Sequence, residues 1–191
     1  SLLTREQGKP LNGMGSRFEI GGAAAWTRHT AGLALPVETI QNDAAAHIAI
    51  HRKPLGVVAS ITPWNWPVMI AIWHIMPAML AGNTVVLKPS PYTPLSTLRL
   101  VELFQAVLPP GVLNVVHGYG GETGEPLVAH PDVRAISFTG STATGNRIVK
   151  AAGLKKFSME LGGKSPFVVF EDAHPERSLD AAVFMIFSNN G

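Results

Sequence analysis

The chain has 191 residues, of which 46% are hydrophobic and only 15% are charged, and its formal net charge is +2. This length suits one domain with a substantial apolar core. The 15 lysines and arginines are scattered along the chain, which argues against a basic stripe for nucleic acid. The absence of cysteine excludes disulfides and thiolate metal sites within this sequence.

No secretory signal pattern opens the chain. The most apolar stretch, residues 68–80, contains His74 and Pro77. At about 13 residues it is too short to span a membrane, so it predicts a buried helix. We therefore expect a cytoplasmic protein with no membrane partner.

The first 33 residues have a helical pattern that is interrupted at residues 8–10 and again at Gly13 and Gly15. Nothing before Ser1 offers a cap, so this opening predicts a helix that starts in mid-turn. Residues 46–52 alternate in polarity and predict a half-exposed strand, and the apolar run 57–61 predicts a second strand after a turn.

From residue 67 onward, short apolar runs alternate with helical segments. The predicted helices are 67–81, 94–108, 121–129, 140–152 and 175–188. The predicted strands are 84–87, 113–116, 135–138, 156–160 and 167–170. This alternation predicts an α/β fold with βαβ units and a mostly parallel sheet.

Residues 138–145 (FTGSTATG) place a strand end, a glycine turn and a helix start in one short segment. Such a helix N-terminus offers free backbone N–H groups and a positive dipole end to a phosphate, with hydroxyls from Ser141 and Thr142. An ordinary serine N-cap explains the same residues equally well. Asn146 and Arg147 follow Gly145, which excludes a Walker A loop.

Two further segments at strand ends are weaker indications of a nucleotide site. Residues 118–124 (GYGGETG) space their glycines one residue too long for the usual dinucleotide fingerprint, and a plain loop is the better interpretation. Lys88 ends a strand, where open α/β sheets bind ligands, so it is a candidate to bind a ribose hydroxyl or a phosphate. A solvated lysine is the competing interpretation.

Asn65 and Glu160 are the candidate catalytic residues. Asn65 stands within residues 63–67 (PWNWP), where two prolines stiffen the chain, so its amide is placed to donate to an oxyanion or, alternatively, to satisfy loop backbone. Glu160 ends an apolar strand, and such a setting would raise a carboxyl pKa and favour a general base. A buried pair of Glu160 with Lys164 or an arginine is the structural alternative.

The seven histidines show no metal-ligand spacing, so no metal site is expected. His47 and His51 are expected to be exposed. His74 lies in an apolar helix and is expected to be a hydrogen-bonded core residue.

The order and spacing of these segments together resemble the aldehyde dehydrogenase superfamily. The matching segments are 63–67, Lys88, 118–124, 138–145, 159–166 (MELGGKSP) and 188–191 (SNNG). The resemblance implies a Rossmann-like domain that binds NAD or NADP, and oxidation of an aldehyde to a carboxylic acid through a cysteine thioester. It also implies a homo-oligomer, a dimer or tetramer, with residues 33–52 containing a protruding oligomerisation hairpin.

The resemblance assigns a role to each candidate residue. Asn65 would be the oxyanion donor and Glu160 the base that activates water. The implied cofactor-binding residues are Lys88 at the adenosine ribose, Gly140 and Ser141 at the pyrophosphate, Gly120 and Gly124 at the adenine side, Ile61, Thr62, Pro63 and Trp64 along the nicotinamide path, and Leu161 beside the ring.

Two departures from the family pattern affect these roles. Many NAD-preferring members carry a glutamate three residues after the lysine, and here that position is Pro91, which leaves NAD and NADP both open. The family pattern also leads from the final residues to a nucleophilic cysteine, and this sequence has none. We therefore expect an incomplete aldehyde dehydrogenase fold, in which residues 1–191 form a partial NAD(P)-binding domain without the catalytic domain.

Three functional hypotheses follow. The chain is a portion of an NAD(P)-dependent aldehyde dehydrogenase, or a non-catalytic nucleotide-binding or subunit-association module (or inactive remnant), or part of a CoA-acylating member. Glu160 argues mildly against the third hypothesis, because that chemistry does without water activation. The aldehyde itself is not indicated by any residue.

Overall fold

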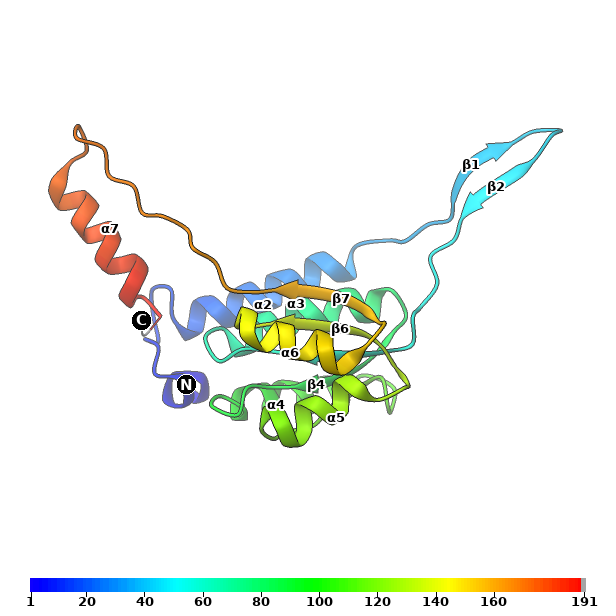
Figure 1. Ribbon diagram of the computed structural model, residues 1–191, viewed down its shortest axis with the longest axis horizontal. Coiled ribbons are helices and arrows are strands. Elements are labelled where there is room, and N and C mark those ends of the chain that lie inside the picture. The colour runs from blue at the N-terminus through cyan, green and yellow to red at the C-terminus, as the bar shows by residue number, and fades with distance from the viewer. Residues whose placement is uncertain (190–191) are drawn as a thin grey trace.

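A five-stranded parallel sheet forms the centre of the computed structural model, which describes residues 1–189 (Figure 1). The strand order is β5-β4-β3-β6-β7. The strands are β3 (Val57–Ile61), β4 (Thr84–Lys88), β5 (Leu113–Val115), β6 (Val133–Thr139) and β7 (Lys156–Glu160). The predicted α/β class and parallel sheet are confirmed.

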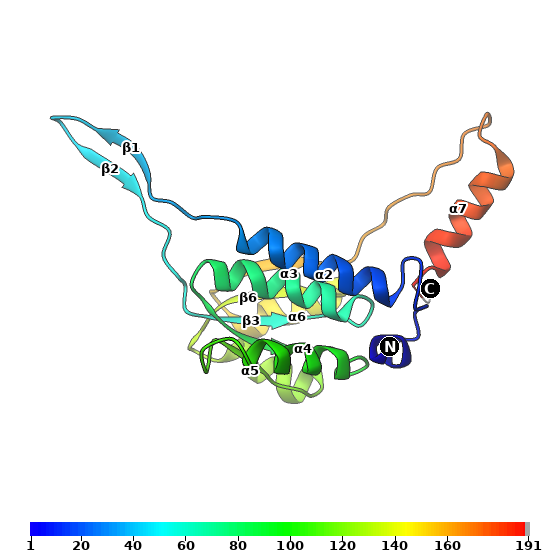
Figure 2. The ribbon, with the colours of Figure 1, turned by 180° about the vertical axis from the view of Figure 1, so that it is seen from behind.

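Helices cover both faces of this sheet, as the two opposite views show (Figures 1 and 2). The helices are α1 (Leu2–Gln7), α2 (Ser16–Ala31), α3 (Pro67–Leu80), α4 (Leu95–Gln105), a π-helical turn η1 (Gly120–Gly124), α5 (Glu125–Ala129), α6 (Thr142–Ala152) and α7 (Pro175–Phe187). Helices α3 and α4 pack on one face with α2 outside α3, while α5 and α6 pack together on the other face.

Side-chain alternation along the strands creates the two halves of the core. Val85 and Leu87 of β4 are fully buried against α3 and α4. Ala59 and Ile61 of β3 point the other way, into the cluster under α5 and α6. Because successive side chains of a strand alternate between faces, Lys88 at the end of β4 shares a face with α5 and α6.

The N-terminal segment differs in one respect from the prediction. The helical pattern is interrupted as expected, with Gly8 at φ 91° ending α1. The expectation that the first helix lacks a cap is wrong, because Ser1 is itself the N-cap and its Oγ accepts a hydrogen bond from Thr4 N. A serine hydroxyl is well suited to that position.

A two-stranded antiparallel hairpin, β1 (Glu38–Asn42) and β2 (His47–Ile50), projects away from the sheet (Figures 1 and 2). It confirms that residues 33–52 contain a protruding hairpin, and β2 matches the predicted strand at 46–52. His47 and His51 are exposed, as expected.

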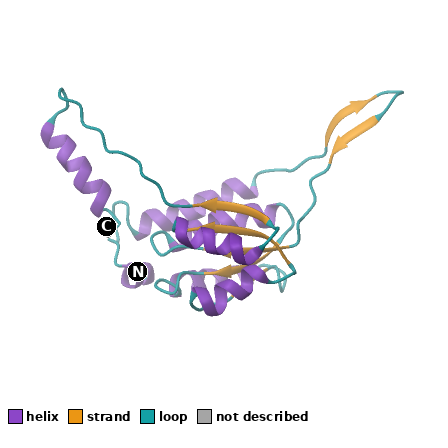
Figure 3. Ribbon diagram, in the orientation of Figure 1, coloured by secondary structure: helices purple, strands orange, loops and turns teal. Residues whose placement is uncertain are grey.

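The predicted strand at 167–170 is wrong. Residues 161–170 form an extended loop, drawn in teal in Figure 3, and Phe170 is 73% exposed. An apolar run needs a neighbouring strand to complete its backbone hydrogen bonds, and the described residues place none beside it. The helix that follows, α7, has no buried residue in this structure. Among residues 1–189, no helix is both long and apolar enough to cross a membrane.

Candidate functional site

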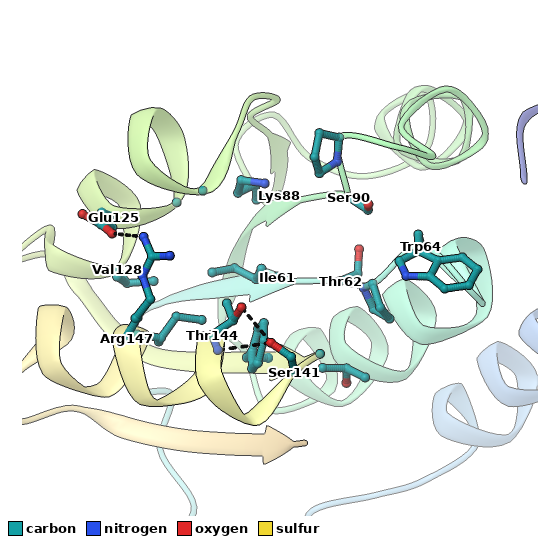
Figure 4. Close-up of a pocket in the computed structure, with 18 of the residues that line it drawn as sticks. Ile61, Thr62, Trp64, Lys88, Ser90, Glu125, Val128, Ser141, Thr144 and Arg147 are labelled. Atoms are coloured by element: carbon teal, nitrogen blue, oxygen red, sulfur yellow. Dashed lines mark hydrogen bonds and ion pairs between the residues drawn. The ribbon is translucent and has the colours of Figure 1, made fainter. Parts of the chain in front are cut away.

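A cavity of about 420 Å³ opens at the carboxyl ends of β3, β4 and β6, on the face covered by α5 and α6 (Figure 4). The strand register pairs Ile61 with Lys88 on one side and with Phe138 on the other, so these three residues lie at one level. The chain builds the sheet outward from β3 through β4 to β5, then returns to the opposite side of β3 at β6. Open α/β sheets bind ligands at such a reversal.

Lys88 is a buried cation that lines this cavity. Lys88 is only 4% exposed, and its Nζ donates a hydrogen bond to the carbonyl of Pro89 at 3.2 Å. Burial lowers the pKa of this amine. The competing interpretation of a solvated lysine is therefore wrong. The backbone at Gly124 lies close to the Lys88 side chain, since a Cβ at Gly124 would be 3.6 Å from Lys88 Cε.

The N-terminus of α6 forms a second side of the cavity. Ser141 is the N-cap of α6, and its Oγ accepts a hydrogen bond from Thr144 N at 3.2 Å, so the capping interpretation is confirmed. Capping does not exclude a ligand, because Ser141 and Gly140 both line the cavity. A Cβ on Gly140 would lie 2.5 Å from the ring of Phe138, which explains the glycine at this turn.

Residues 61–64 form the third side. Thr62 N donates to Lys88 O at 3.2 Å and extends the strand pairing by one residue. Thr62 is 4% exposed, and its Oγ1 is buried without a hydrogen-bond partner among residues 1–189. A buried hydroxyl without a partner is costly, so this group indicates a place for a ligand atom. Trp64 lies at one end of the cavity in Figure 4.

Arg147 and Glu125 join α6 to α5 at the other end of the cavity, with Arg147 Nη2 3.0 Å from Glu125 Oε1 (Figure 4). Neither residue was predicted from the sequence to line a ligand site. Four more lining residues were not predicted either: Ser90, Tyr92, Val128 and Ile148. Pro91, Phe138, Thr139 and Thr144 also line the cavity and belong to positions that the sequence had singled out. The helical spacing of residues 144, 147 and 148 was the available signal, because such residues share one helix face.

Nine of the ten predicted cofactor-binding residues line this single cavity, namely Ile61, Thr62, Pro63, Trp64, Lys88, Gly120, Gly124, Gly140 and Ser141. Leu161 does not line it. A Cβ on Gly145 would lie 2.6 Å from Leu161 Cδ2, so Leu161 packs against the first turns of α6 instead.

Asn65 lies just beyond the cavity lining, in the loop before α3. Its carbonyl accepts a hydrogen bond from Lys9 Nζ at 2.6 Å and another from Asn189 Nδ2 at 3.2 Å. Its own Oδ1 accepts from Trp66 N at 3.0 Å. The side chain therefore does satisfy loop backbone through its oxygen, while its Nδ2 donates to no residue in the described part of the chain.

Glu160 is exposed, which contradicts both the predicted apolar setting and the alternative of a buried pair. The reason is strand alternation. The side chain of Met159 packs on the core under α5 and α6, so its neighbour Glu160 points to the opposite face of the sheet. The backbone of Glu160 still contacts the cavity turn, because its carbonyl accepts from Gly140 N at 2.9 Å.

His74 is a hydrogen-bonded residue between α3 and the sheet, as predicted. Its Nδ1 lies 3.0 Å from Ser60 Oγ and its Nε2 lies 3.1 Å from Thr139 Oγ1. Burial lowers its pKa to about 4. No group of three or more histidine or acidic residues suited to a metal ion occurs within residues 1–189.

Comparison with known proteins identifies the chain's relatives. The model of the aldehyde dehydrogenase family matches residues 1–191. The chain belongs to the aldehyde dehydrogenase family. It is 59% identical over 140 residues to 5-carboxymethyl-2-hydroxymuconate semialdehyde dehydrogenase of Escherichia coli, covering 73% of this chain and 30% of that enzyme.

Solved structures share the fold of the whole chain. The crystal structure of PnpE in complex with nicotinamide adenine dinucleotide matches with a TM-score of 0.91 and 46% identity, covering 100% of this chain and 40% of that one. An Escherichia coli NADP-dependent enzyme matches with a TM-score of 0.88 and 41% identity, over 100% of this chain and 40% of that one. The chain thus spans less than half the length of each of these relatives.

Proposed function

We propose that the cavity binds a nicotinamide dinucleotide, NAD or NADP. The observation that carries this proposal is the buried Lys88 facing the N-terminus of α6 across a cavity at the sheet reversal. Lys88 has no acidic partner within residues 1–189, so it offers its N–H groups to ribose hydroxyls or phosphate oxygens. The solved relatives with bound NAD or with NADP dependence support this choice of ligand.

The cavity residues fit the parts of a dinucleotide. Lys88 would bind the adenosine ribose, Gly140 and Ser141 the pyrophosphate, and Gly120 and Gly124 would shape the adenine side. Residues 61–64 would line the nicotinamide path, where the unpaired hydroxyl of Thr62 supplies a hydrogen bond. Leu161 would lie beside the ring at the start of α6.

The proposed reaction of the whole protein is the oxidation of an aldehyde to a carboxylic acid, with the cofactor accepting the hydride. In this reaction the free Nδ2 of Asn65 would donate a hydrogen bond to the oxyanion. Glu160, exposed at the end of β7, would accept the proton of a water molecule. The nucleophile is a cysteine thiolate, and the 191 residues contain none. We therefore expect no aldehyde oxidation by this chain alone.

Titration calorimetry with NAD and with NADP tests the cofactor proposal. We expect saturable binding by the wild-type chain, weakened about tenfold or more in Lys88→Met, because a hydrogen bond from a charged group is lost. Ser141→Ala should weaken binding less. Lys150→Met is the matched control, because Lys150 is exposed on α6 away from the cavity. Equal losses in the two lysine variants, or no binding by folded protein, would overturn the proposal.

A subunit-association role for the hairpin is the second candidate. Val37, Ile40, Ile48 and Ile50 are all at least 43% exposed on or beside β1 and β2. Solvated apolar side chains on a projecting hairpin mark an interaction surface. We propose that this surface joins copies of the chain into a dimer or tetramer. Sedimentation of the wild type and of Ile40→Asp tests it, and an unchanged mass distribution would count against the proposal.

A further inference from the structure

A fully buried ion pair lies beneath the loop that carries Asn65. Lys9 follows α1 and Glu19 lies in the first turn of α2, and both side chains are 0% exposed. Lys9 Nζ lies 2.6 Å from Glu19 Oε2. Neither residue lines the cavity described above. The pair therefore has no direct part in holding a ligand there.

Lys9 fixes the end of the loop, just before α3, through two contacts. Its Nζ donates to the carbonyl of Asn65 at 2.6 Å. The same atom lies 3.9 Å from the centre of the Trp66 ring, within cation–π distance. Phe18 contacts the same ring in an edge-to-face arrangement, with centroids 5.8 Å apart.

Glu19 fixes the first turn of α3, which follows the loop. Its Oε1 accepts hydrogen bonds from Val68 N at 2.8 Å and Met69 N at 3.1 Å, so it caps α3 from a different helix. Trp66, the residue at the N-cap position of α3, makes no side-chain cap of its own. The first-turn N–H groups of α3 would otherwise be buried without partners.

A buried ion pair is a poor device for stability alone, because the loss of hydration offsets much of the attraction. This pair instead fixes the conformation of the backbone around Asn65. Lys9 fixes the Asn65 carbonyl, Glu19 fixes the turn that follows, and Asn65 Oδ1 bonds to Trp66 N. These contacts leave Asn65 Nδ2 without a hydrogen-bond partner in residues 1–189.

We propose that Lys9 and Glu19 are positioning residues for Asn65, which hold its side-chain amide ready to donate to a ligand oxygen. The proposal rests on the proposed role of Asn65 in the function described above. It concerns the geometry of one loop, so it can be tested separately from cofactor binding.

The test is nuclear magnetic resonance of the ¹⁵N-labelled 191-residue chain, which reports the side-chain amide of each asparagine. Asn65→Asp identifies the Asn65 signal by its loss. We expect Lys9→Met to shift that signal toward the position of a mobile, solvated amide. The affinity for NAD should remain within about twofold of the wild type, because neither partner lines the cavity.

Two further variants separate positioning from folding. Glu19→Gln keeps an oxygen to accept from Val68 and Met69 while it weakens the bond to Lys9, so it should shift the Asn65 signal with α3 intact. Lys9→Met combined with Glu19→Gln leaves no unpaired charge at this buried pair, so it serves as the test where Lys9→Met alone does not fold. Arg17→Met, on the exposed side of α2, is the matched control.

An Asn65 signal that is the same in the wild type, Lys9→Met and Glu19→Gln would overturn the positioning role, whatever the NAD titration shows. Absence of NAD binding by the wild type would instead defeat the proposed function. The positioning role would still be tested by the NMR signal of the Asn65 side-chain amide. The two failures are therefore distinguishable.

Discussion

Nε2 of His74 lies 3.1 Å from Oγ1 of Thr139, which lines the cavity at the end of β6. The other ring nitrogen of His74 lies 3.0 Å from Ser60 Oγ on β3. One imidazole therefore ties α3 to two neighbouring strands near the candidate site. The neutral ring suits this place, because one nitrogen can donate while the other accepts.

Acid should destabilise the protein through His74. Burial lowers the pKa of His74 from 6.5 to about 4, so the unfolded chain binds a proton there more readily than the folded chain. The contribution of His74 to stability is full above about pH 6.5, is lost progressively between about pH 6.5 and 4, and changes no further below that, with a loss of up to about 3 kcal/mol. Urea unfolding across this range should show a flatter dependence in His74→Gln. His130→Gln, at an exposed histidine, should keep the wild-type slope.

Cofactor choice should respond to residue 91. Pro91 lines the cavity three residues after Lys88, between Ser90 and Tyr92. A carboxylate introduced there would repel a 2′-phosphate and offer acceptors to ribose hydroxyls, so Pro91→Glu should favour NAD over NADP by about tenfold. Calorimetric dissociation constants for both nucleotides provide the measurement. Pro91→Gln is the uncharged control, and an equal shift in both variants would show that charge is not the cause.

Gly140 should tolerate no larger residue. A Cβ there would lie 2.5 Å from Cζ of Phe138, which is 4% exposed and packed in the core. We expect Gly140→Ala to cost about 1–3 kcal/mol of unfolding free energy through overpacking, and to weaken NAD binding because the turn shifts. Gly163→Ala is the control, since a Cβ there meets nothing within 4 Å. Similar unfolding free energies for the two variants would refute the packing argument.

Much of the fold follows from local pattern. The runs at β3, β4 and β6 are short, apolar and separated by helical segments, and each lies where the sequence predicts it. Lys88 was a candidate because it ends a buried strand, and the carboxyl ends of parallel strands meet at one edge. These inferences need only the spacing of residues along the chain.

The failures involve contacts between distant segments. The direction of Glu160 depends on which face Met159 packs against, and composition alone does not give that face. Residues 167–170 have the composition of a strand, but a strand also requires a partner beside it. The cavity residues Glu125 and Arg147 come together only because α5 packs against α6.

Glu6 should contribute to stability as a cap supplied by another helix. Its carboxylate accepts hydrogen bonds from the N–H groups of Leu95 and Ser96 at the start of α4, where Pro94 provides no side-chain cap. We expect Glu6→Ala to lower the unfolding free energy by about 1 kcal/mol, as the loss of an N-cap does. Denaturant midpoints measure this directly. Glu102→Ala is the control, because it removes an exposed carboxylate from α4 itself. The ion pair of Glu102 with Arg99 should be worth less than about 0.5 kcal/mol. Equal losses for the two variants would mean that the carboxylate of Glu6 acts as an ordinary surface charge and that α4 starts without its help.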